Sequence, residues 1–382
     1  MRIEEAISAA KQAVVDGHLT PAALGNLTCW LTEPRYSRYQ SSIVAHIAEG
    51  KWQKLDDVFW TVIPFGTGGR RGRMYEFGSN AINERTIGES AQGLASYILE
   101  QPRAAGERLS CAIAYDTRHR SREFAELCAR VMVANGFEVV FLDDYRATPQ
   151  LSFAVRYKKC DCGIMVTASH NPPSDNAVKV YWSTGGQVLP PHDKAIIERV
   201  MNVDEIKLVD FAQALSAGQV KICTNEVDQA YFAEVNQFAW TGPRDAKIVY
   251  SPLHGVGTFA VMPVLKQADF HDCEVYGPHA EPNGDFPNVP GHVSNPENPA
   301  VFDAIIERAQ AIGADVILAT DPDCDRLGVA APLATDTSGP WGTINGNQIG
   351  ALLTDFACAR MKQLGQLSEK SYVIKTLVTT DL

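Results

Sequence analysis

The sequence lacks any run of eighteen apolar residues, so we expect no transmembrane helix. An apolar signal-peptide core is also missing, because the opening MRIEEAISAAKQAVVDG carries acidic residues early, and no export signal is visible. Positive charge is not in excess, since the 382-residue chain has a formal net charge of −11. This balance argues against general binding to nucleic acid or to anionic membranes. It still allows a local basic pocket for a phosphorylated small molecule.

A disulfide framework is absent as well. The nine cysteines are scattered, and their odd number does not suggest a set of pairs. Cys160 and Cys162 are separated by one residue, and no second pair lies nearby to complete a zinc site. We therefore expect a cytoplasmic protein with reduced thiols. Nothing in the sequence indicates an oligomeric state.

Familiar nucleotide and hydrolase motifs are missing too. PFGTGGRRG (64–72) has Arg71 where the third glycine of a dinucleotide loop belongs, and no G-x-x-x-x-G-K-[ST] occurs. A G-x-S-x-G elbow is also absent. What remains at 64–72 is a flexible loop with Arg70 and Arg71, whose guanidinium groups and neighbouring backbone amides suit a phosphate. A solvated turn with two arginines is the alternative.

The periodicity of the apolar residues predicts an α/β protein. Residues 1–60 favour helices, and VFWTVIPFG (58–66) favours a strand. Strand and helix patterns then alternate, which indicates successive α/β units with parallel or mixed sheets. The last segments, 345–365 and 371–380, favour one helix and one strand. These cannot bury the faces of a sheet by themselves, so the sequence looks cut off inside a domain.

A polar loop follows the apolar strand in GIMVTASHNPPSDNAVK (163–179). Ser169 and His170 stand side by side where the strand ends, and ligand sites of α/β proteins form at such ends. A lone serine is a weak nucleophile that needs activation, and His170 and Lys179 could transfer protons or bind phosphate. The alternative is an Asn-Pro turn with an N-capping serine.

An acidic loop follows another apolar strand in ADVILATDPDCDRLGV (314–329). Asp321, Asp323 and Asp325 would repel one another unless a cation holds them, and oxygen-only ligands favour Mg²⁺. Arg326 and Pro332 stand where an EF-hand needs glycine and glutamate, so that motif is excluded. A metal with Arg326 beside it would stabilise the charge of a transferring phosphoryl group. An acidic surface turn is the alternative.

Two weaker patterns are interpreted as structural. YSPLHGVG (250–257) ends a strand with His254 and two glycines, which is typical of a turn. In YDTRHRS (115–121), a salt bridge between Asp116 and Arg118 would fix a loop.

FGTGGRR, TASHNPPSDNAVK, PLHGVG and DPDCDR occur in this order with wide spacing, and together they resemble the α-D-phosphohexomutase superfamily of phosphoglucomutases and phosphomannomutases. The helical first 60 residues and the form FGTGGRRG look most like its longer phosphoglucomutase/phosphopentomutase-type branch. The resemblance covers the chain from about residue 60 onward. It implies successive α/β domains with mixed sheets sandwiched by helices, the third domain incomplete and the fourth absent. The implied division is a helical extension packed on domain 1 (1–60), domain 1 with the phosphoserine loop (61–215), domain 2 with the metal loop (216–332) and part of domain 3 (333–382).

The resemblance implies a phosphosugar mutase. Such an enzyme interconverts a sugar 1-phosphate with a 6-phosphate, or a 5-phosphate, through a phosphoserine and a bisphosphorylated sugar. It would use Mg²⁺ and an activator of the glucose 1,6-bisphosphate type. A Mg²⁺-dependent sugar-phosphate phosphatase and a non-catalytic sugar-phosphate binding protein are the alternatives. Because the family's sugar-recognition and distal phosphate loops are absent, we expect little or no activity, and glucose, mannose, pentose and aminosugar substrates remain open.

The resemblance also implies roles for individual residues. The Mg²⁺ ligands would be a phosphoserine oxygen and three carboxylates, from Ser169, Asp321, Asp323 and Asp325. Catalytic roles would fall to the phosphoserine and four cationic or imidazole side chains, of which Lys179 would do acid/base work: Ser169, His170, Lys179, Arg71 and Arg326. Contacts to the substrate would come from Thr67, Arg70 and Lys375.

The sequence departs from the family pattern at two small positions. Ala177 replaces the usual glycine of the serine loop, and Cys324 replaces the glycine inside the metal motif. Either change would matter if the position needs a positive φ, which glycine adopts at low cost.

Overall fold

The computed structural model describes residues 1–376 apart from 67, 104, 105 and 107. These residues fall into two compact units. The first unit comprises Met1–Tyr115, His119–Leu142 and Leu151–Cys223, and the second comprises Asp116–Arg118, Asp143–Gln150 and the chain from Thr224 onward. No helix in the described part of the chain is both long and apolar enough to cross a bilayer.

The first unit is built on a six-stranded mixed sheet. Its strands are β1 (Gly69–Arg73), β2 (Leu109–Tyr115), β3 (Phe137–Phe141), β4 (Cys162–Val166), β5 (Asp175–Trp182) and β6 (Val220–Ile222). Their order is β1-β5-β4-β2-β3-β6. The strands β4, β2, β3 and β6 are mutually parallel. At one edge, β5 pairs antiparallel with β4, and β1 pairs antiparallel with β5. Every residue of β4 is buried, as expected for a strand covered on both faces.

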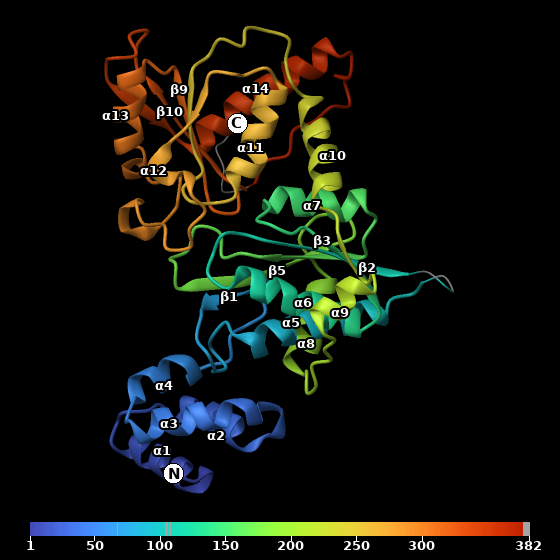
Figure 1. Cartoon of the computed structure of the whole chain (residues 1–382), viewed down its shortest axis with the longest axis vertical. Coiled ribbons are helices and arrows are strands. Elements are labelled where there is room, and N and C mark those ends of the chain that lie inside the picture. Colours follow the sequence, from blue (N-terminus) through green and yellow to red (C-terminus); the bar gives the residue numbers. More distant parts are fainter. Residues whose placement is uncertain (67, 104–105, 107, 377–382) are drawn as a thin grey trace. The chain divides into compact units, whose positions relative to one another are not determined.

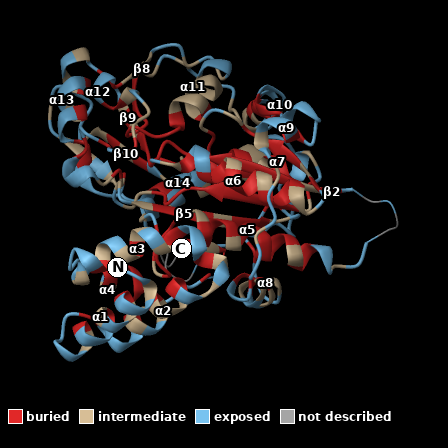
Figure 2. Cartoon of the chain, turned by 60° about the horizontal axis from the view of Figure 1, so that its bottom comes forward, coloured by how far each residue is buried: buried red, intermediate tan, exposed pale blue. Residues whose placement is uncertain are grey.

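Helices cover both faces of this sheet. They are α5 (Glu84–Leu99), α6 (Ser121–Ala134), α7 (Thr148–Tyr157), α8 (His192–Met201) and α9 (Phe211–Ser216). Figure 1 shows α7 on one face and α5 and α6 on the other. Figure 2 shows that α6 and the strands beneath it are largely buried. The side chain of Asn83 starts α5 by accepting hydrogen bonds from the N–H groups of Arg85 and Thr86.

The N-terminal extension is helical and has its own apolar core. It contains α1 (Ile3–Val15), α2 (Pro21–Thr32), the 3₁₀ helix η1 (Pro34–Tyr39), α3 (Gln40–Ala48) and α4 (Trp52–Phe59). Trp30 stacks on Tyr36 with ring centroids 4.3 Å apart and meets the edge of Phe59 at 5.7 Å. This core extends to Phe77, which follows β1.

The strand predicted over residues 58–66 is wrong. Val58 and Phe59 close helix α4, and residues 60–65 belong to no strand. The reason is that Leu55, Val58 and Phe59 are all buried in the extension core at a helical spacing. Burial against neighbouring helices therefore outweighs the β-propensity of the local sequence.

Polar contacts also tie the extension to α5. The guanidinium of Arg85 lies 5.1 Å from the centre of the Tyr36 ring, and Arg38 forms an ion pair with Glu84. Exposed pairs such as Arg38–Glu84 contribute only about 0–1 kcal/mol each. The buried aromatic and aliphatic side chains therefore supply most of the stabilisation of the extension.

The second unit contains a five-stranded mixed sheet. Its strands are β7 (Ile248–Ser251), β8 (Cys273–Val275), β9 (Val316–Thr320), β10 (Leu327–Pro332) and β11 (Trp341–Ile344), in the order β11-β10-β9-β7-β8. Its helices are α10 (Thr224–Asn236), α11 (Gly257–Gln267), α12 (Gly277–Ala280), η2 (Pro290–His292), η3 (Pro299–Val301), α13 (Asp303–Ile312) and α14 (Gly346–Gln363). The strands β9, β7 and β8 are parallel, β10 pairs antiparallel with β9, and β11 pairs antiparallel with β10. The predicted α/β class with mixed sheets is confirmed.

The strand predicted over residues 371–380 is not formed where the structure describes it. Residues 371–376 are exposed and adopt no regular structure, and 377–380 lie outside the described residues. A strand is stable only when its backbone N–H and C=O groups pair with a neighbouring strand. No described strand pairs with this segment.

The backbone conformation at residue 69, at the start of β1, requires glycine. Its φ is +147°, and a Cβ atom there would lie 1.9 Å from the carbonyl oxygen of Val178 on β5.

We predict that Gly69→Ala lowers the free energy of unfolding by about 2 kcal/mol or more, because β1 must move away from β5. Gly25→Ala provides a control of opposite sign: Gly25 is exposed inside α2 with no atom near the added Cβ, so alanine should stabilise by about 0.5–1 kcal/mol. Urea unfolding of both variants measures the difference, and equal effects would contradict the backbone argument.

Candidate active site

Ser169 lies in a strained turn at the carboxyl end of β4. Its φ is +54°, in the left-handed region, and the residue is only 2% exposed. The N–H of Ser169 donates to Thr167 Oγ1 at 2.8 Å, which closes the turn. The Oγ atom lies 3.3 Å from Nδ1 of His170. A left-handed residue other than glycine costs about 1 kcal/mol or more, and such strain is concentrated at functional sites.

The strand register places Lys179 on β5, the strand that pairs with β4. On β5 it stands opposite Met165 of β4 and opposite Gly69 of β1. The residue is half-buried. After the serine loop the chain continues as β5, which runs antiparallel beside β4, and Lys179 lies on this strand.

Arg70 and Arg71 have different surroundings because successive side chains of a strand point to opposite faces. Arg71 is exposed, and its Nη1 donates to Asn171 Oδ1 at 3.2 Å, which joins β1 to the serine loop. Arg70 is 1% exposed and donates to Glu89 Oε2 at 2.8 Å and to the carbonyl of Thr86 at 3.0 Å. The structure thus brings Arg71, and not Arg70, to the serine loop, through Asn171. Thr67, which was predicted with Arg70 to contact the substrate, lies outside the described residues.

In the second unit, the three carboxylates meet directly after β9. Asp321 and Asp323 are fully buried and Asp325 is exposed, and one oxygen of each lies within 4.8 Å of the others. The loop organises its own charges, because the N–H groups of Asp325 and Arg326 both donate to Asp321 Oδ1 at 3.1 Å. Clustered hard oxygen donors of this kind fit Mg²⁺.

Two further side chains hold the acidic loop. Thr148 Oγ1 donates to Asp323 Oδ2 at 2.7 Å, and the N–H of Thr148 donates to the carbonyl of Asp323. Arg326 Nε lies 4.0 Å from Asp321 Oδ2 and 3.9 Å from Asp325 Oδ1. Thr148 could not be identified from the sequence, because no local pattern links it to a loop 175 residues away.

The two departures from the family pattern have different consequences. Ala177 lies in β5 with ordinary extended geometry, so it needs no glycine. Cys324 has φ +55°, so a non-glycine residue there carries backbone strain. Burial, reinforced by the neighbouring carboxylates, raises the pKa of the Cys324 thiol to about 12. The thiol is therefore protonated at neutral pH.

The segment PLHGVG braces the acidic loop. A Cβ on Gly255 would lie 2.4 Å from the Cα of Pro322, and the N–H of Val256 donates to the carbonyl of Pro322 at 2.9 Å. His254 is buried, and its Nδ1 lies 2.8 Å from the carbonyl of Glu281. The structural interpretation of this segment is confirmed.

The loop YDTRHRS is also fixed as predicted. Arg118 Nε lies 3.5 Å from Asp116 Oδ2, and the N–H of Arg118 donates to Asp116 Oδ1 at 3.0 Å. Lys375, by contrast, is exposed in the segment without regular structure, so its predicted contact with substrate stays a prediction.

The fold and the two loops define a class: paired α/β units that each present a polar loop where a buried parallel strand ends. Models of phosphoglucomutase/phosphomannomutase α/β/α domain I and domain II match residues 63–207 and 229–333. These two matches together span more than half of the chain. The chain therefore belongs to the phosphoglucomutase/phosphomannomutase family.

Individual relatives agree with this assignment. The phosphoglucomutase of Staphylococcus saprophyticus is 35% identical over 328 residues, which are 85% of this chain and 57% of that protein. That of Staphylococcus aureus strain N315 is 33% identical over 351 residues, or 90% and 60% of the two chains. The crystal structure of a family protein from Burkholderia thailandensis superposes with a TM-score of 0.58 at 21% identity, covering 78% of this chain and 59% of that one. The chain thus spans less than two thirds of these relatives.

We predict that Mg²⁺ binds the acidic loop and raises the melting temperature of the protein. At a concentration one hundred times Kd, the gain is about 2.7 kcal/mol. Asp323→Asn should abolish this gain without lowering the metal-free melting temperature, because it removes a ligand and a repelling charge together. Asp336→Asn is the control, since Asp336 is a carboxylate in an exposed turn bonded to Ser338. A full Mg²⁺ response in Asp323→Asn would exclude this site.

His279 gives the second unit a dependence on pH. It is buried, with Ser251 Oγ 2.9 Å from Nδ1 and the carbonyl of Asn288 3.0 Å from Nε2. Burial lowers the pKa of His279, and His254 nearby acts in the same direction. The imidazole of His279 therefore binds a proton more readily in the unfolded chain than in the folded one. The stability that neutral His279 contributes is present above about pH 6.5 and is lost as pH falls. We predict that the drop in melting temperature between about pH 7.5 and 5.5 becomes smaller in His279→Gln. An unchanged slope would assign the acid sensitivity to other groups.

Proposed function

We propose that this chain carries the phosphoryl-transfer centre of a phosphosugar mutase, with Ser169 as the residue that holds the transferred phosphoryl group. The observation that supports this most is the setting of Ser169. Ser169 lies in the strained turn that follows the buried strand β4, and its hydroxyl is next to His170. Asn171 of the same loop is hydrogen-bonded to Arg71. A structural turn has no need of this collection, whereas a phosphoserine needs nearby donors and cations.

The proposed reaction uses the residues of the first unit in distinct roles. A sugar hydroxyl attacks the phosphorus of phospho-Ser169, so a bond from the sugar oxygen to phosphorus forms and the bond to Ser169 Oγ breaks. Lys179, when neutral, accepts the hydroxyl proton, and it returns a proton in the reverse direction. His170 contacts the reacting group, and Arg71 neutralises the phosphoryl oxygens.

The carboxylates of Asp321, Asp323 and Asp325 would hold Mg²⁺ in this reaction, and an oxygen of phospho-Ser169 would complete the set. When bound, Mg²⁺ supplies Lewis-acid stabilisation of the charge on the transferring oxygens. Arg326 adds a guanidinium beside the acidic loop. The burial of Asp321 and Asp323 supports the assignment, because a merely solvated acidic turn would leave its carboxylates exposed.

The substrate in this proposal is a sugar monophosphate. A bisphosphorylated sugar forms after the first transfer, and the second transfer returns the other phosphate to Ser169, which interconverts the 1-phosphate with the 6-phosphate or 5-phosphate. The names of the staphylococcal relatives favour glucose 1-phosphate. Thr67 and Lys375 stay in the proposal as substrate contacts. Arg70 does not, because its guanidinium is committed to Glu89 and Thr86.

We predict that incubation with glucose 1,6-bisphosphate and Mg²⁺ increases the intact mass by about 80 Da, the mass of one phosphoryl group, and that the increment maps to Ser169. Ser169→Ala should remove it. Ser174→Ala is the matched control, since Ser174 is an exposed serine of the same loop. Phosphate release without an isomerised sugar would favour the phosphatase alternative. No phosphorylation of Ser169 would favour a sugar-phosphate binding protein.

A further inference from the structure

A cavity separate from the Ser169 hydroxyl lies between the N-terminal extension and β1. Its volume is about 430 Å³, within the ~300–1,000 Å³ range of small-ligand pockets. The lining comes from α4, from the segment that follows it, from β1 and from the turn after β1. It consists of Lys54, Asp57, Val58, Ile63, Pro64, Arg71, Gly72, Arg73, Tyr75, Asn80 and Ala81.

The charge of the lining is positive and is not balanced by neighbours. Lys54, Arg71 and Arg73 contribute three cations, and Asp57 is the one carboxylate. Among the described residues, no carboxylate lies within ion-pair distance of these three cations. Arg71 and Arg73 are exposed, whereas the buried arginines Arg70 and Arg85 are both paired with Glu89.

The walls of the cavity are held by backbone hydrogen bonds. The N–H of Asn80 donates to the carbonyl of Val58, and its side-chain amide donates to the carbonyl of Asp57 at 3.0 Å. The hydroxyl of Tyr75 lies 2.7 Å from His46 Nε2, and Lys54 Nζ lies 5.2 Å from the centre of the Tyr75 ring. Lys54 is thus positioned over a fixed aromatic ring before any ligand arrives.

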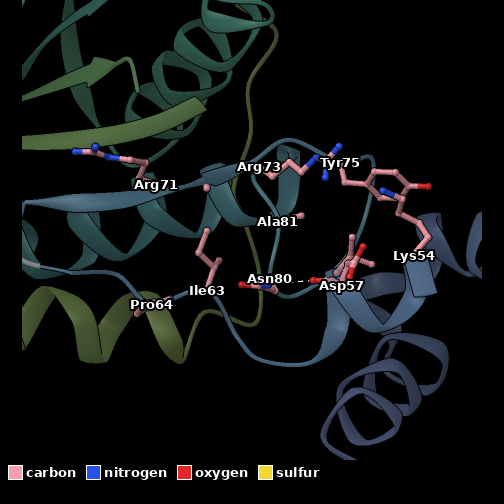
Figure 3. Close-up of a pocket in the computed structure, with 11 residues that line it drawn as sticks. Lys54, Asp57, Ile63, Pro64, Arg71, Arg73, Tyr75, Asn80 and Ala81 are labelled. Atoms are coloured by element: carbon pink, nitrogen blue, oxygen red, sulfur yellow. Dashed lines mark hydrogen bonds between the residues drawn. The ribbon is translucent and has the colours of Figure 1, made fainter. Parts of the chain in front are cut away.

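Figure 3 shows how these side chains lie. Arg73, Tyr75, Lys54 and Asp57 gather at one end of the cavity, and the Arg71 side chain extends away from them. Lys54 and Arg73 therefore face one region from two different elements. Two cations that converge there suit a phosphate group, and Asp57 beside them suits a hydroxyl donor.

We propose that this cavity binds a phosphate monoester of a small polyhydroxy compound, with Lys54 and Arg73 on the phosphate and Asp57 accepting a hydroxyl hydrogen. The site goes beyond the proposed function, because it needs neither a phosphoserine nor the metal. It shares β1 with the candidate active site. A ligand here would contact the strand that carries Arg71, and so would bind next to the residue that joins β1 to the serine loop.

The test measures hydrogen exchange and binding on the whole chain, with glucose 6-phosphate, inorganic phosphate and uncharged glucose as probes. We expect glucose 6-phosphate to slow amide exchange in residues 52–58 and 71–75, and glucose to have no effect. Lys54→Gln and Arg73→Gln should each weaken binding by about tenfold, since each removes one charge-assisted contact. Neither substitution removes a described ion pair, so both variants should fold. Lys51→Gln is the matched control: Lys51 is exposed, pairs with Glu49 and does not line the cavity.

The outcomes separate this site from the active site. Equal protection by inorganic phosphate would overturn the hydroxyl contact at Asp57 and assign the cavity to free phosphate. If the protein never forms a phosphoserine, the proposed function fails. Glucose 6-phosphate binding that persists in Ser169→Ala would still support the cavity in that case. Unprotected 52–58 and 71–75 segments, or unchanged affinity in both Lys54→Gln and Arg73→Gln, would overturn the inference.

Discussion

The repulsion among three carboxylates is the constraint on which the second unit depends. Two unit charges 4.8 Å apart repel by about 3–4 kcal/mol at an effective dielectric of ~20, so three such pairs approach 10 kcal/mol. This is comparable to the whole net stability of a domain, about 5–15 kcal/mol. The surrounding structure offsets it with donors and cations: two backbone N–H groups reach Asp321, Thr148 reaches Asp323, and Arg326 approaches Asp325. The close packing of Gly255 on Pro322 then fixes the backbone that carries these charges.

Features with a local cause could be predicted from the sequence. The acidic triplet and the serine loop were found because polar residues follow buried strands directly, and such strand ends are where α/β sites form. The last two residues of α4, Val58 and Phe59, were assigned to a strand because they are buried by α2 and by Phe77, which are distant in sequence. Thr148 was missed for the same reason. Arg70 and Arg71 could not be separated either, because GRRGR carries no alternating apolar pattern to mark it as a strand.

Short strand β1 links several parts of the first unit. Arg70, on one face, enters the ion-pair cluster of Glu89 and Arg85, and Arg85 lies over Tyr36 of the extension. Arg71, on the other face, bonds to Asn171 of the serine loop. Arg73, at the end of the strand, lines the cavity. A five-residue strand at a sheet edge thus joins the extension, the serine loop and the cavity. The tight fit of Gly69 against Val178 keeps these side chains in register.

The left-handed backbone of Ser169 also bears on which hydroxyl amino acid can occupy the position. Threonine carries a branched β-carbon, and branched residues at positive φ are genuine steric outliers. Tyrosine would have to fit a bulky ring at a position that is only 2% exposed. The turn therefore admits serine and disfavours the other two hydroxyl side chains on steric grounds alone. In this loop, backbone geometry alone restricts which hydroxyl side chain can stand at the candidate site.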